Sequence, residues 1–213
     1  KAKIAAGKTL LYREPPHYIT LGKELPAKAL DEILTDHAEV FTELKEYYKQ
    51  TSESETTKIS FYEDTYSLYN LYRFSHYYEE AYGKYIWLKS GASLVIEHTE
   101  AMTVIDVNTG SVLKKKKQED TLFYQINREA AKEIARQLRL RNISGIIMID
   151  FINMKDTAQK EKLLSLLDSE CKKDRVHCNV IDMTALNLVE MTRSKVRKPL
   201  HEQIRSCMKN NRS

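Results

Sequence analysis

Apolar side chains recur at helical spacing in several stretches of the chain. The clearest is 121–140, where one face collects Leu122, Ile126, Ala130, Ala131, Ile134, Ala135 and Leu138. The same period marks 31–49 and 156–173, so the pattern predicts three amphipathic helices. A tyrosine-rich stretch, 67–85, has apolar positions that are also compatible with a helix.

Short runs rich in β-branched residues, bounded by turn residues, predict the strands. The most apolar run, 146–151, is typical of a buried central strand. The other predicted strands are 8–12, 17–21, 58–62, 93–97, 102–107 and 179–183. In the second half of the chain, strands and helices alternate. The sequence therefore predicts a layered α/β (α+β) fold.

The composition fits a globular domain of this kind. The 213 residues are 42% hydrophobic and 30% charged, and no apolar run approaches the roughly 20 residues that span a bilayer. No signal peptide is recognisable at the start, although the first residue is not Met, which leaves open that the chain is a fragment. Three cysteines without a CxxC pair indicate free thiols, so we expect a cytoplasmic protein with no membrane span.

Positive charge is concentrated in two stretches. The net charge is only +4, but 114–141 holds nine basic and four acidic residues, and 191–213 holds seven basic residues and one acidic residue. Such clusters are typical of a protein that contacts a phosphate backbone, although a solvated surface can have the same composition. The tyrosines of 67–85 could stack on bases, but at helical spacing they are more often core and rim residues.

Two aspartates interrupt apolar strands. Asp106 lies in 102–107 and Asp150 in 146–151, where a carboxylate is costly unless it is paired or bound to a metal. If the strands are neighbours, both carboxylates emerge at one end of the sheet and suit Mg²⁺, while Asn108 lies on the same side and could orient one of them. The alternative is that one aspartate caps a loop and the other pairs with an arginine.

Several long motifs resemble the RNase E/G family of endoribonucleases. They are Ser90-Gly91 followed by LVI at 94–96, TEAMTVIDVNTG at 99–110, NREAAKEIARQLRLRNI at 127–143, GIIMIDFINM at 145–154 and LVEMTR at 188–193. Together they cover roughly 87–200. The segment 10–80 resembles the family's preceding region much more weakly.

The resemblance implies a domain organisation and an activity. It suggests a partial RNase H-like subdomain with a remnant of the 5′-end-sensing region at 1–80, a DNase I-like catalytic subdomain at 81–200 and a basic tail at 201–213. The family hydrolyses single-stranded, often A/U-rich RNA in RNA processing and decay, leaving a 5′-phosphate on the downstream product. Its metal-holding aspartates match Asp106 and Asp150, and its supporting asparagine matches Asn108.

Basic residues near these motifs are the candidate RNA contacts. They are Lys114, Lys115, Lys116 and Lys117 in the loop after Asp106, together with Arg136, Arg139, Arg141 and Arg175. The expected cofactor is Mg²⁺, with Mn²⁺ equally suited to oxygen ligands. The expected partner is single-stranded RNA, and the sequence is compatible with a homo-oligomer.

The chain departs from the family pattern in three places. The S1-type RNA-binding domain and most of the sensor do not occur in it. Cys207 has Asn210 where a second zinc-linking cysteine would fall, so no zinc link between subunits is expected. His177 replaces a frequent arginine, and a phosphate contact there would depend on pH.

Two other functions compete with RNA cleavage. A non-catalytic RNA-binding module could retain the fold, but such a protein would be expected to have lost one of the residues Asp106, Asn108 and Asp150. A metal-dependent DNase or phosphatase is disfavoured by the basic loop 114–117 and by the family-specific motifs.

Overall fold

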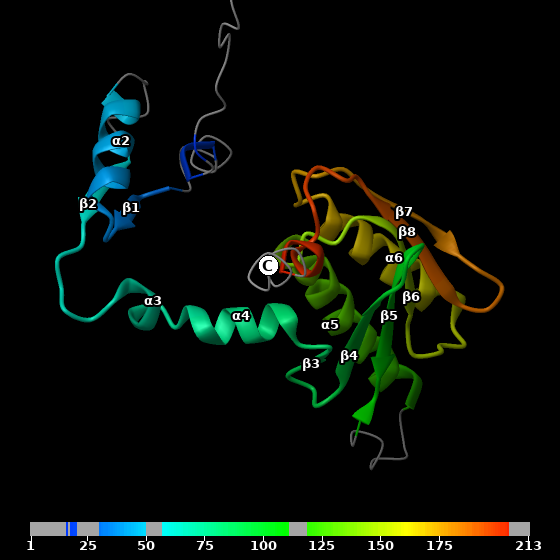
Figure 1. Ribbon diagram of the computed structural model, residues 1–213. Helices are drawn as coiled ribbons and strands as arrows, with labels where there is room; N and C mark the ends of the chain where they lie inside the picture. The colour runs from blue at the N-terminus through cyan, green and yellow to red at the C-terminus, as the bar shows by residue number, and fades with distance from the viewer. Residues whose placement is uncertain (1–15, 17, 21–29, 50–56, 111–118, 205–213) are drawn as a thin grey trace, which may run out of the picture. The chain divides into compact units, whose positions relative to one another are not determined.

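A computed structural model describes residues 16, 18–20, 30–49, 57–110 and 119–204 (Figure 1). The chain divides into two compact units, 1–75 and 76–213, each described separately below. The division lies five residues before the boundary expected at 80.

In the first unit, one helix packs on a two-stranded parallel sheet. Strand β1 (Glu32–Thr35) pairs with β2 (Lys58–Phe61), and α2 (Ala38–Lys49) covers them. The small core holds Ile19, Leu44 and Tyr48, with Ile33, Val40 and Ile59 packed against it. A short helix, α3 (Leu68–Leu71), follows, and the Ser67 side chain caps it.

Two expectations for this unit were wrong. The helix predicted over 31–49 begins only at Ala38, because Ile33 and Leu34 pair with β2 instead. The strand predicted over 17–21 is helical at 18–20, where the amides of Ile19 and Thr20 both donate to the Pro16 carbonyl. The strand predicted over 8–12 lies outside the described residues.

The second unit contains a mixed six-stranded sheet (Figure 1). In spatial order its strands are β3 (Tyr85–Trp87), β4 (Ser93–His98), β5 (Met102–Asn108), β6 (Gly145–Asp150), β8 (Leu188–Arg193) and β7 (Cys178–Met183). Strands β5 and β6 are parallel, and the other neighbours are antiparallel. The mixed α and β architecture confirms the predicted α+β class.

Two helices, α5 (Glu119–Leu140) and α6 (Thr157–Cys171), cover one face of this sheet. Alternate residues of β5 are buried toward them, namely Thr103, Ile105 and Val107, because side chains alternate along a strand. The residues between them, including Asp106, lie on the opposite face. Asp156 caps α6 by accepting from the Ala158 amide at 2.9 Å.

Other features of this unit were not predicted. The tyrosine-rich stretch 67–85 does not form one helix: it holds α3, which belongs to the first unit, then α4 (Phe74–Tyr82), and it ends at the first residue of β3. The residues before the tail form strand β8, which inserts between β6 and β7, and 200–204 are helical. Among the described residues, no helix is long and apolar enough to cross a bilayer.

Candidate metal and RNA site

Asp106 and Asp150 occupy paired positions on the parallel strands β5 and β6. Paired residues of neighbouring strands project from the same face, with strands about 4.8 Å apart. Both aspartates therefore present their carboxylates side by side on the sheet face that α5 and α6 leave uncovered. The register confirms that the two strands are neighbours, which was the condition for a shared site.

Asn108 supports this pair from the end of β5. Its side-chain amide donates to Asp106 Oδ2 at 2.7 Å, so one carboxylate is held in a fixed orientation. Within the described part of the chain, no lysine or arginine forms an ion pair with Asp106 or Asp150. The alternative in which an arginine neutralises one aspartate finds no support in these residues.

The electrostatics of the pair suit a cation. Partial burial raises the pKa of Asp150 above its usual value, and the neighbouring charge of Asp106 raises it further. Two adjacent carboxylates repel each other, and a bound cation would relieve that repulsion. The described residues hold no cluster of three or more metal-binding side chains, so water and phosphate oxygens would complete the shell, as Mg²⁺ prefers.

The loop after Asn108 packs closely on the turn before β4. Gly110 has a φ of +56°, and a Cβ built there would lie 2.7 Å from the Gly91 carbonyl oxygen. Any other residue would therefore push these two loops apart. The contact places the turn 89–91 beside the candidate metal site. The predicted RNA-binding residues Lys114, Lys115, Lys116 and Lys117 lie outside the described residues.

Two exposed aromatic residues share the open face with the carboxylates. Tyr85 pairs with Val95, which pairs with Asp106, and Trp87 pairs with Ser93, which pairs with Asn108. The exposed fraction is 59% for Tyr85 and 73% for Trp87. Sequence reasoning missed both as site residues, although a lone tryptophan beside a strand of alternating pattern was the available signal.

Trp87 also lines a groove of about 450 Å³ between β3 and α5. Its charged lining is mixed: Lys89, Lys132, Arg136 and Arg139 are basic, and Glu80, Glu129 and Glu133 are acidic. Arg136 already pairs with Glu80 and Glu133, which raises its pKa, whereas Arg139 is exposed and donates to the Glu170 carbonyl at 3.4 Å. Two of the predicted RNA contacts therefore lie in one groove with an aromatic side chain.

The other two predicted contacts lie elsewhere. Arg141 comes shortly before β6, which begins at Gly145, and Arg175 comes shortly before β7, which begins at Cys178. Gly145 and Cys178 both pair with Arg193 of β8. Both therefore lie toward the end of the sheet opposite Asp150. The structure does not bring Arg141 or Arg175 to the carboxylates.

The family comparison agrees with the motifs at this site. The model of the ribonuclease E/G family matches residues 1–196. The chain belongs to the ribonuclease E/G family. A match of this extent covers both units and includes all three residues of the carboxylate site.

Named ribonucleases of the same family match most of the chain. Ribonuclease G of Haemophilus influenzae is 37% identical over 91% of the chain, and ribonuclease G of Escherichia coli strain K12 is 38% identical over 80%. Ribonuclease E of a Nostoc species is 31% identical over 95%. The matches cover 39%, 35% and 30% of these three proteins, so the chain spans well under half of their length.

Proposed function

We propose that this ribonuclease E/G family chain carries the catalytic site of a Mg²⁺-dependent endoribonuclease that hydrolyses single-stranded, A/U-rich RNA. The observation that carries the proposal is the direct pairing of Asp106 with Asp150, with Asn108 bonded to the former. The expected role is RNA processing or decay in the cytoplasm. Mn²⁺ could replace Mg²⁺, because the same oxygen ligands suit both.

The roles of the side chains follow from their positions. Asp106 and Asp150 would hold the metal ion, and Asn108 would keep the Asp106 carboxylate turned toward it. A bound Mg²⁺ supplies Lewis acidity at a phosphoryl oxygen and lowers the pKa of its water. The chain itself would position the scissile phosphodiester through lysines 114–117 and through the basic side chains Lys89, Lys132 and Arg139 of the groove along α5.

Trp87 and Tyr85 would hold the single strand next to the carboxylates. Base stacking on an aromatic side chain tolerates any base and requires an unpaired strand. The two rings are exposed on the carboxylate face, and Trp87 also lines the groove along α5. This arrangement supports single-stranded RNA as the substrate over a duplex, whose bases are stacked inside.

A second candidate is a non-catalytic RNA-binding module with the same fold. It would need basic side chains and the aromatic rings but not the carboxylates of Asp106 and Asp150. Asp106 and Asp150 form no ion pair in the described part of the chain, so no structural role in an ion pair accounts for their presence there. The intact pair therefore favours catalysis.

Cleavage of an A/U-rich, single-stranded RNA tests the proposal. The chain is assayed with Mg²⁺ and with EDTA, beside Asp106→Asn and Asp150→Asn. Asp182→Asn is a matched control, because Asp182 is an exposed carboxylate of the same sheet, on β7. We expect Mg²⁺-dependent cleavage that both site variants lose and the control retains.

The other outcomes separate the two candidates. Full turnover in either site variant would refute the metal assignment. RNA binding without cleavage and without Mg²⁺ binding would favour the non-catalytic module. Mg²⁺ binding without cleavage would show that the site needs the parts of the longer relatives that this chain does not span.

A further inference from the structure

Helix α5 contacts two segments that border the carboxylate pair. One is the segment after Asp150, where β6 ends and the chain leaves the sheet. The other is the turn between β3 and β4, which packs against the loop after Asn108. The side chains that make these contacts are Asn127 and Glu129, two residues apart near the middle of α5.

Asn127 binds the backbone just beyond Asp150. Its side-chain amide donates to the Ile152 carbonyl at 2.7 Å, and its side-chain oxygen accepts from the Ile152 amide at 3.0 Å. These are the two bonds that a residue of an antiparallel strand exchanges with its partner. Asn127 is 0% exposed, at a helix position where an amphipathic pattern calls for an apolar residue. The contact with Ile152 is the reason for an amide there.

Glu129 holds the turn on the other side of the pair. One carboxylate oxygen accepts from the Lys89 amide at 2.7 Å, and the other accepts from the Ser90 amide at 3.2 Å. Bonds from backbone amides to a carboxylate are among the stronger hydrogen bonds of proteins. The next residue of the turn, Gly91, is the one whose carbonyl lies against Gly110. The carboxylate therefore fixes a turn that touches the loop after β5.

Both contacts bear on the geometry of the carboxylate pair. The ladders from β6 to β5 and from β6 to β8 both end at Asp150, so neither neighbouring strand supports the chain beyond that residue. Asn127 continues this support for two more residues. A metal ion shared between two strands requires its ligands to be held within about 0.5 Å of their productive positions. Such precision depends on the segments on either side of the pair.

We propose that Asn127 and Glu129 are positioning residues of the metal site. Asn127 fixes the end of β6 that carries Asp150, and Glu129 fixes the turn that supports the loop after Asp106. The inference rests on the proposed metal-dependent function. Because α5 covers the sheet face opposite to the carboxylates, these two side chains act through the backbone and touch neither the metal ion nor the scissile phosphate.

Amide hydrogen exchange of the whole chain without Mg²⁺ tests the contacts themselves. Asn127→Ala should speed exchange of the Ile152 amide, and Glu129→Ala should speed exchange of the Lys89 and Ser90 amides. We expect an increase of roughly tenfold, as for the loss of a charged hydrogen bond or of a buried neutral one. Unchanged exchange at these amides would show that other groups hold the two segments, and would overturn the proposal.

Calorimetric titration with Mg²⁺ tests the effect on the site. Asn127→Ala and Glu129→Ala should each raise the dissociation constant of Mg²⁺ about tenfold, the lower end of the effect of groups that orient metal ligands. Glu129→Gln, which keeps one accepting oxygen, should recover part of the affinity. Cleavage by the variants should return toward the wild-type rate at saturating Mg²⁺, because Asp106 and Asp150 themselves remain.

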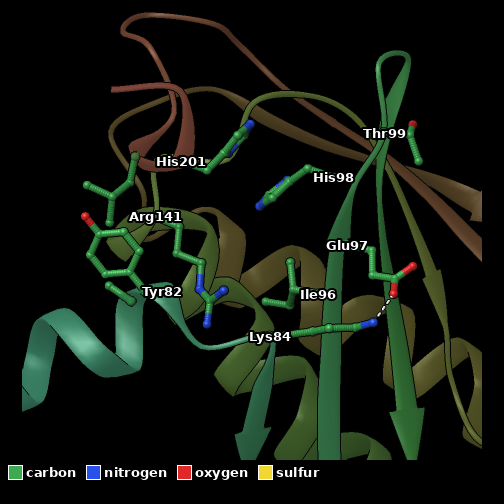
Figure 2. A pocket seen from close by; sticks show the side chains of 10 residues that line it. Tyr82, Lys84, Ile96, Glu97, His98, Thr99, Arg141 and His201 are labelled. Carbon is green, nitrogen blue, oxygen red and sulfur yellow. Dashed lines mark ion pairs between the residues drawn. The ribbon is translucent and has the colours of Figure 1, made fainter. Parts of the chain in front are cut away.

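Gln137→Ala is the matched control for Asn127→Ala. Gln137 is a second amide of α5 that is 0% exposed, and its oxygen accepts from Arg141 Nε at 2.7 Å. Ten helical residues place it ~15 Å along the axis from Asn127. Arg141 lines a pocket of about 340 Å³ with His98, at the end of β4 remote from the carboxylates (Figure 2). Gln137→Ala should lower stability in urea as Asn127→Ala does, but should leave Mg²⁺ affinity unchanged.

Glu170→Ala is the corresponding control for Glu129→Ala. Glu170 lies on α6, its side chain is 15% exposed, and it pairs with Lys173 at 2.6 Å. Its loss should leave Mg²⁺ affinity unchanged. Because Glu129 is only half-buried, its variants keep the test open even where Asn127→Ala fails to fold.

The outcomes separate this proposal from the function on which it rests. A wild-type chain that binds no Mg²⁺ contradicts the metal-dependent function, and the positioning role falls with it. A wild-type chain that binds Mg²⁺, with Asn127→Ala and Glu129→Ala retaining its affinity, overturns the positioning role alone. An equal loss of affinity in Gln137→Ala would trace the effect to lower stability of the fold and would also overturn that role.

Discussion

Asp106 and Asp150 stand opposite one another on the parallel strands β5 and β6, in the last register pair that the two strands share. Such a position keeps both backbones rigid up to the carboxylates, and the chain leaves the sheet directly after Asp150 and two residues after Asp106. Side chains held in this way have little freedom to separate, although their charges repel. The pair is therefore preorganised for the proposed cation, which would relieve the repulsion between the two carboxylates.

Mg²⁺ should stabilise the folded chain against heat. A ligand that binds only the folded state at a hundred times its dissociation constant adds about 2.7 kcal/mol. For a chain of this size each kcal/mol raises Tm by roughly 2–4 °C. Asp150→Asn should lose most of this rise while Asp182→Asn keeps it, as followed by thermal denaturation with Mg²⁺ and with EDTA. The same rise in both variants would place the Mg²⁺ elsewhere.

Asn108→Ala should lower Mg²⁺ affinity or cleavage by about 10–100-fold, because the Asp106 carboxylate loses the amide that orients it. Titration of Mg²⁺ and single-turnover cleavage both report the change. Asn179→Ala, an exposed asparagine on β7, is the matched control. An Asn108→Ala chain with unchanged affinity and rate would show that the hydrogen bond does not support the site.

Trp87→Ala should weaken binding of single-stranded RNA by roughly 5–150-fold, equivalent to the ~1–3 kcal/mol of one base stack. Trp87→Phe should retain much of the affinity, since a phenyl ring also stacks. Fluorescence anisotropy with a labelled oligonucleotide measures both. Leu186→Ala removes an apolar side chain that is 78% exposed and should have no effect. If Leu186→Ala weakened binding equally, stacking at Trp87 would not be the cause.

The stability of the chain should fall as the pH drops from about 6.5 toward about 4, partly because of His98. Its pKa is about 4 in the folded chain, where burial, His201 and Arg141 all oppose protonation. The unfolded chain therefore binds the proton first, near the ordinary value of about 6.5, and unfolding becomes easier across that window. Below about 4 both states are protonated and this contribution changes no further.

Urea denaturation at several pH values measures this effect. His98→Gln should flatten the fall in stability between about 6.5 and 4, whereas His177→Gln, at an exposed position, should not. An NMR titration of the His98 ring gives its pKa directly. A value near 6.5 would contradict the burial of this histidine.

The helices of the sheet unit and its apolar strands were predicted because each follows from a local period. The run at 146–151 forms β6, and the helical stripe of 121–140 forms α5. Strand β8 was missed, although Leu188, Val189 and Met191 are apolar, because no turn or period separates it from the tail. In the sheet β8 lies between β6 and β7 and pairs antiparallel with both. β6 is distant from it in the sequence, whereas β7 comes just before it.

Arg193 illustrates what a basic stretch in the sequence conceals. It was counted among the positive charges of the tail, yet its side chain is 3% exposed and pairs with Asp174 at 2.9 Å. Its Nη1 also donates to Asn142 Oδ1 and the Ile143 carbonyl. This arginine holds three segments together, so charge clustering alone overstated the surface available to RNA.

The sequence by itself determined the family, the α+β class and the residues expected to hold the metal ion, because motif residues and hydrophobic periods are local properties. Only the tertiary structure decided the strand order, which pairs Asp106 with Asp150 and puts Trp87 on the same face. It also separated Arg141 from the carboxylates and enclosed it in a pocket with His98. These relations depend on pairing and packing between distant segments, and the spacing of residues along the chain does not specify them.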